Sequence, residues 1–64
     1  MFTVRYTTTL SGMVHRLPFD TKAKALAEIV QLYREGARDI RLIEKVGDEF
    51  KLVDWRKALK GKLA

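Results

Sequence analysis

The chain has 64 residues and a mass of 7.4 kDa, so it forms one small domain at most. Hydrophobic residues make up 47% of it and charged residues 33%, which is a globular composition whose core is too small for an elaborate active site or a large buried cofactor. The net charge of +5 favours an anionic partner, and the lack of cysteine excludes disulfides, zinc–thiolate sites and thiol catalysis.

Alternating side chains at the start of the chain predict a β-hairpin. Residues 2–10 alternate with the period of a half-buried strand, Ser11-Gly12 is typical of a tight turn, and a second strand follows over residues 13–19. Pro18 has no backbone N–H, so we expect the second strand at an edge of the sheet. A two-residue turn would set the following residues opposite each other: Leu10 and Met13, Thr8 and His15, Tyr6 and Leu17, Val4 and Phe19.

A helical pattern follows this hairpin. Asp20 or Thr21 is a suitable N-cap, residues 22–35 have helical spacing, and Gly36 suits the left-handed position that ends a helix. Leu32 falls outside the expected apolar stripe and is predicted to be partly exposed. The residues expected to face the core are Leu26, Val30, Tyr33 and Ala37, flanked by Ala23 and Ile29.

A second hairpin is predicted over residues 40–54, with strands at 40–46 and 49–54 and a type II′-compatible turn at Gly47-Asp48. A three-residue loop is the alternative, and would set Val46 opposite Phe50. The preferred register pairs Ile40 with Trp55, Arg41 with Asp54, Leu42 with Val53, Ile43 with Leu52, and Glu44 with Lys51.

The end of the chain is expected to form a short basic amphipathic helix or tail over residues 55–64, with Asp54 as its N-cap. Both faces of the second hairpin carry apolar residues, so one helix cannot cover them all. We therefore expect this C-terminal segment to cover part of the second face. Its apolar stripe consists of Trp55, Ala58, Leu59 and Leu63.

These elements predict a single α+β domain of β-β-α-β-β-(α) order, with residues 1–54 as the hairpin–helix–hairpin core. This order over residues 2–54 resembles that of β-grasp domains, such as the immunoglobulin-binding domains of proteins G and L. The resemblance implies a four-stranded mixed sheet packed on one helix. In such a sheet the first and last strands pair in parallel at the centre, and the second strand is an edge.

No side-chain constellation in the sequence indicates catalysis. His15 is the single histidine; it is expected to face Thr8, a weak nucleophile with nothing to activate it, and it has no second metal ligand beside it. Ser11 is the single serine and lies in an expected turn. We therefore expect a cytoplasmic protein that is not an enzyme, needs no metal or cofactor, and has no membrane partner.

The uneven charge distribution indicates either a binding surface or a solvated tail that keeps a small protein soluble. Residues 51–64 carry five basic residues and one acid, and so hold +4 of the net charge. The main hypothesis is a small protein-interaction or regulatory module with an acidic protein partner, with pairing of two copies through a sheet edge as a further expectation. The alternative is a nucleic-acid-binding protein. The candidate contacts are Arg5, Arg16, Arg56, Lys57, Lys60 and Lys62, and Trp55 is either an interface anchor or a cap on the core.

Overall fold

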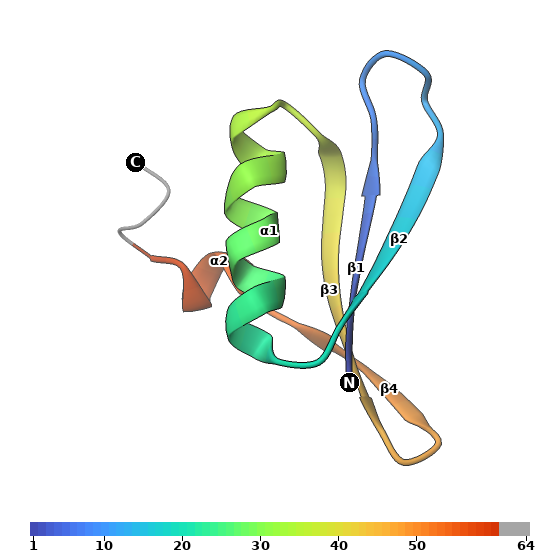
Figure 1. The fold of residues 1–64 in the computed structure, drawn as a ribbon, viewed down its shortest axis with the longest axis vertical. Helices are drawn as coiled ribbons and strands as arrows, with labels where there is room; N and C mark the ends of the chain where they lie inside the picture. The colour runs from blue at the N-terminus through green and yellow to red at the C-terminus, as the bar shows by residue number, and fades with distance from the viewer. Residues whose placement is uncertain (61–64) are drawn as a thin grey trace.

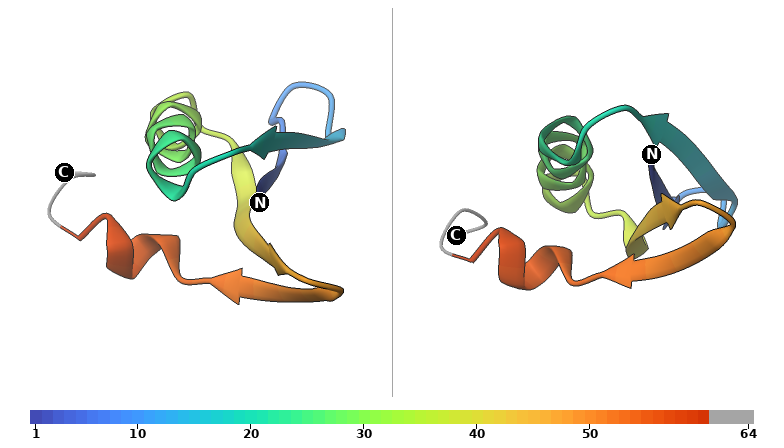
Figure 2. Two further views of the ribbon diagram at one scale, coloured as in Figure 1. Left: turned by 60° about the horizontal axis from the view of Figure 1, so that its bottom comes forward. Right: turned by 90° about the horizontal axis from the view of Figure 1, so that it is seen from below.

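The computed structural model describes residues 1–60 and confirms a small α+β domain. Its elements are β1 (Phe2–Thr7), β2 (Val14–Phe19), α1 (Lys22–Arg34), β3 (Arg38–Val46), β4 (Glu49–Val53) and α2 (Trp55–Ala58). The strands form one four-stranded sheet in the order β2-β1-β3-β4. Every neighbouring pair in it is antiparallel, and both helices lie on the same side (Figures 1 and 2).

The centre of the sheet is the pair β1–β3, which corrects the β-grasp expectation of a mixed sheet. β1 pairs antiparallel with β3, while β4 lies at the edge and does not touch β1 in the ladder. The physical reason is burial, because the register sets Val4 opposite Leu42 and both side chains are 0% exposed. In β4 four of the five residues are exposed and only Val53 is half-buried, so a central position for this strand would bury little additional apolar surface.

The first hairpin keeps its predicted faces but not its predicted register. Val4 lies opposite Leu17 rather than Phe19, a shift of two residues that leaves the same side chains on the core face. The cause is a longer turn, in which the N–H of Gly12 donates to the carbonyl of Thr8 at 3.0 Å. In this turn Gly12 has a φ of 68°. A two-residue turn at Ser11-Gly12 would require a positive φ at Ser11 as well, which is unfavourable for serine.

β2 is an edge strand, as Pro18 predicted. The other edge, β4, follows a two-residue turn in which Gly47 has a φ of 60°. The predicted register of this second hairpin is confirmed by three pairs of the ladder: Leu42 with Val53, Ile43 with Leu52, and Glu44 with Lys51.

α1 begins at Thr21, whose hydroxyl accepts a hydrogen bond from the N–H of Lys24 at 3.3 Å, as the N-cap prediction requires. The helix is rotated from the expected orientation. Leu32 is 4% exposed rather than partly exposed, and Tyr33 is 43% exposed rather than in the core. The helix has two apolar neighbours, since one stripe faces the sheet and the next faces α2. The buried stripe is Ala25, Ile29 and Leu32, and the stripe beside α2 includes Ala23, Leu26, Ala27 and Val30.

The C-terminal segment begins as predicted but packs on the other face of the sheet. The Asp54 side chain accepts a hydrogen bond from the N–H of Lys57 at 3.1 Å and caps α2. Trp55 and Leu59 are 6% and 4% exposed and belong to the same core as α1, so they do not cover the second face (Figure 2). Leu63 of the expected stripe lies outside the described residues.

Trp55 is fixed by a hydrogen bond as well as by packing. Its indole N–H donates to the carbonyl of Ile40 at 2.8 Å, and its ring meets Tyr33 edge-on at 6.2 Å between centroids. This bond ties α2 back to β3, which explains how a helix of four residues holds its place. Within residues 1–60 no helix has the length and apolarity to cross a membrane.

We predict that Ile29→Val lowers the free energy of unfolding by about 0.5–1.5 kcal/mol, because it removes one methylene from a fully buried position. Urea denaturation would measure this change. Leu52→Ala removes more apolar atoms from a side chain that is 72% exposed, and should change stability by less than about 0.5 kcal/mol. Equal losses in the two variants would contradict the burial of Ile29 on α1 and the exposure of Leu52 on β4.

Trp55→Phe should lower the free energy of unfolding by about 1–3 kcal/mol, since it leaves the carbonyl of Ile40 without its donor while keeping an aromatic ring in place. Thermal unfolding followed by far-UV circular dichroism would test this. Tyr33→Phe, which keeps the edge-on contact, is the matched control and should be nearly neutral. A neutral Trp55→Phe would show that the hydrogen bond contributes nothing to stability.

Candidate functional site

The face of the sheet turned away from both helices is open to solvent. Within residues 1–60 no helix or strand covers this face (Figure 2). Exposed apolar side chains lie among its polar ones. Phe50 and Leu52 are 70% and 72% exposed, and Val14 is 49% exposed. For residues 55–60, the described part of the C-terminal segment, the expectation that it covers this face is wrong, because Trp55 packs in the core and is hydrogen-bonded to β3. We call this surface the open face.

Three arginines form a row across the open face. Arg5 on β1 lies directly opposite Arg16 on β2 and directly opposite Arg41 on β3. Neighbouring strands are about 4.8 Å apart, so the three arginine side chains extend from one narrow band across the sheet. Like charges directly opposite each other destabilise a sheet. Such a row therefore destabilises the sheet, and an anion bound beside it would offset the repulsion. We call it the arginine row.

Arg5 and Arg16 were both candidates from the sequence, but Arg41 was not. The β-grasp order kept β1 apart from β3 and so hid the neighbour of Arg5. The expected pairing of Arg41 with Asp54 also removed its charge from consideration. In the structure the ladder ends at Leu42 and Val53, so the two predicted pairs beyond it, Arg41 with Asp54 and Ile40 with Trp55, do not form, and Asp54 caps α2 instead. The sequence signal that could have revealed the row is the match between Val4 and Leu42. Pairing these two apolar residues sets the register of β1 against β3 and so places Arg5 opposite Arg41.

A β-bulge lies at one end of the arginine row. The register of β1 and β3 shifts between Arg5 and Thr7, and Asp39 takes a φ of 51°. Aspartate tolerates this left-handed conformation better than most residues. The bulge places Asp39 beside a hollow of about 220 Å³ that Arg5 and Arg41 also line. One carboxylate thus stands against the positive charge of the row.

A second hollow of about 280 Å³ lies on the open face between the arginine row and β4. Its wall combines two guanidinium groups, a hydroxyl, an aliphatic side chain and an aromatic ring. None of the five described residues that line it is acidic. They are Thr3, Arg5, Arg16, Ile43 and Phe50. The Nζ of Lys45 lies 5.9 Å from the centre of the Phe50 ring and adds a further cation beside the hollow.

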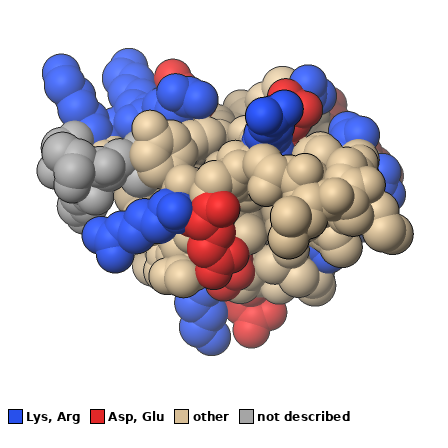
Figure 3. Space-filling view, turned by 90° about the horizontal axis from the view of Figure 1, so that it is seen from above, with Lys and Arg blue, Asp and Glu red and all other residues tan. Residues whose placement is uncertain are grey.

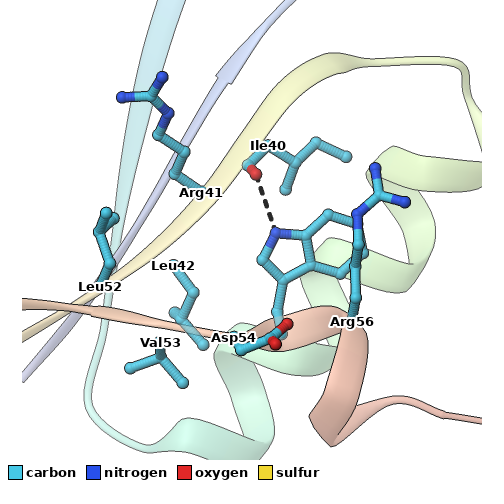
Figure 4. Close-up of a pocket in the computed structure, with 8 residues that line it drawn as sticks. Ile40, Arg41, Leu42, Leu52, Val53, Asp54 and Arg56 are labelled. Carbon is cyan, nitrogen blue, oxygen red and sulfur yellow. Dashed lines mark hydrogen bonds between the residues drawn. The ribbon is translucent and has the colours of Figure 1, made fainter.

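The C-terminal candidates lie elsewhere on the molecule. Arg56 stacks its guanidinium over the buried Trp55 ring at 4.9 Å, while Lys57 and Lys60 are exposed. Lys62 lies outside the described residues. Arg56 and Arg41 line one shallow hollow but leave it in different directions (Figure 4). The cations are not confined to the C-terminal side, because Figure 3 shows them on the opposite side as well.

Trp55 offers little surface for a partner, because only 6% of it is exposed. The exposed aromatic side chain near the arginines is instead Phe50. The sequence predicted the correct face for Phe50, but also predicted that the C-terminal segment would cover that face. This arrangement of cations beside an apolar ring can bind a ligand that carries negative charge on one side and a flat apolar group on the other.

Comparison of the chain with protein-family models, with curated proteins and with solved structures finds no match. The assignment of a function therefore depends on the chemistry of the open face.

Arg5→Gln should stabilise the protein. It removes the central charge of the arginine row, so we expect the free energy of unfolding to rise by about 0.2–1 kcal/mol at low salt. The gain should shrink as added salt screens the repulsion. Thermal unfolding at low and high salt would measure both effects.

The control for this variant is Lys51→Gln, which removes a cation that lies opposite Glu44 and should lower stability slightly. An Arg5→Gln protein that is less stable than the parent at every salt concentration would mean that the row is held by favourable contacts.

Proposed function

We propose that the protein binds nucleic acid through the open face, with the arginine row in contact with phosphate groups. The observation that carries this proposal is the alignment of Arg16, Arg5 and Arg41 across three strands on a face that no described element covers. Arginine is suited to phosphate because its planar fork donates two parallel hydrogen bonds to one oxyanion group.

The chemistry around the row supports this function. Thr3 and Thr7 alternate with Arg5 on β1 and bring hydroxyl groups to the same face. Hydroxyl and guanidinium groups are common donors to phosphate oxygens. Arg38 lies opposite Thr7 on the same face, so the positive surface continues along β3.

An exposed aromatic side chain near the row also supports this function. The first hairpin has no outward aromatic side chain, because Phe2 and Tyr6 pack against the core. Phe50 supplies an exposed ring from β4, on the same face as Arg5. An exposed aromatic ring and the arginine row thus lie on the same face of the sheet.

An acidic protein is the second candidate partner. It is favoured by the exposed aliphatic part of the open face, where Leu52 lies opposite Ile43. Aliphatic side chains of this kind are common in protein interfaces and stack on bases less well than aromatic rings do. An acidic segment with its own apolar side chains would match both halves of the face.

The test compares two triple variants with the same change in charge. Arg5→Gln, Arg16→Gln and Arg41→Gln together remove the arginine row, whereas Arg56→Gln, Lys57→Gln and Lys60→Gln remove three C-terminal cations. We expect the first set to reduce the slope of log affinity against log salt by about 2–3, at about 0.7–0.9 for each lost phosphate contact. The second set should change it much less. Fluorescence anisotropy with labelled oligonucleotides measures both slopes.

Equal losses of affinity in the two triple variants would show that net charge alone governs binding and would contradict the assignment to the row. No binding of any oligonucleotide, together with saturable binding of a poly-glutamate chain, would instead support the acidic protein partner.

A further inference from the structure

We infer that the open face takes single-stranded rather than duplex nucleic acid, with one base stacked on Phe50 while neighbouring phosphates lie on the arginine row. This inference rests on the proposed function and adds the class of ligand. It is drawn from the hollow of about 280 Å³ in which Arg5, Arg16 and Phe50 face a common space.

The hollow has two chemically different sides. Arg5 and Arg16 stand on the side of β1 and β2, and the Phe50 ring stands on β4. β1 and β4 are separated by β3 alone, so the axes of these two strands are about 10 Å apart across the sheet. That separation lets the phosphate and the base of one nucleotide lie side by side on the surface.

The floor of the hollow is suited to a base. Ile43, half-buried between Thr3 on one neighbouring strand and Leu52 on the other, presents an aliphatic surface there. Phe50 is 70% exposed, so its ring is accessible to a flat ligand. Lys45, 5.9 Å from the centre of that ring, can meet the phosphate that follows the stacked base.

A duplex cannot use this arrangement. Its bases are stacked on each other, and proteins reach their edges with an element that projects into a groove. The aromatic ring of the open face borders a hollow instead of projecting. The turn of the first hairpin does project (Figure 1), but residues 8–13 carry no charged side chain to hold it between two phosphate backbones. A duplex would therefore meet the cations alone, whereas a single strand would meet the cations and the ring.

The experiment uses the full chain and two labelled probes of matched length and sequence, a single-stranded oligonucleotide and a blunt duplex, by anisotropy at fixed salt. We expect the single strand to bind at least about 10-fold more tightly. Phe50→Leu should weaken single-strand binding by about 5- to 30-fold and leave duplex binding unchanged, because it removes the stacking surface and keeps every charge. Phe50→Trp should retain single-strand affinity.

Tyr33→Leu is the matched control, since it removes an aromatic side chain that is 43% exposed on α1, away from the open face. It should bind both probes as the parent does. Circular dichroism of each variant confirms that the fold is kept, which is expected for Phe50→Leu because Phe50 is not part of the core cluster.

Three results would each contradict a different statement: the preference for a single strand, the stacking role of Phe50, or the proposed function itself. Equal affinity for the two probes with no effect of Phe50→Leu would overturn the single-strand inference and leave the proposed function in place. A salt slope that changes with Phe50→Leu would mean that the ring acts through the cations rather than by stacking. Failure of both probes to bind would overturn the proposed function itself.

Discussion

The antiparallel pairing of β1 with β3 is the contact on which the rest of the structure depends. It brings Val4 and Leu42 together under α1, and these two side chains with Ile29 are the largest that are fully buried. The same pairing sets Arg5 beside Arg41 on the other side of the sheet, because side chains alternate between faces. Core and candidate site are thus two consequences of one register.

The elements themselves could be predicted from the sequence, since each depends on neighbours along the chain. The Thr21 cap, the second hairpin register and the edge position of Pro18 all follow from local chemistry. The strand order could not be predicted in this way. It depends on whether β3 or β4 gains more from a central place, and both hairpins fit either order locally. The face of α1 was misjudged because α2 added a second apolar neighbour for Leu26 and Val30.

The same limit explains how much of the site was foreseen. Arg5 and Arg16 belong to one hairpin and lie directly opposite each other on the open face, so only short-range pairing is needed to bring them together. Arg41 and Phe50 join them only through contacts between strands distant in the sequence. The position of Trp55 explains why the open face is uncovered within residues 1–60, since its hydrogen bond to Ile40 holds α2 on the helical side of the sheet. Both described helices lie on one side of the sheet, and within residues 1–60 the other face stays uncovered (Figure 2).

The two edges of the sheet differ in a way that limits how copies of the chain could associate. Pro18 in β2 cannot donate a backbone hydrogen bond, and β2 is therefore a poor template for an added strand. β4 has no proline, and its five residues end at the cap of α2. If two chains paired through β4, the exposed edge of each β4 strand would hydrogen-bond to the exposed edge of the other. Such pairing is isologous, so it closes at two copies and does not propagate into a filament.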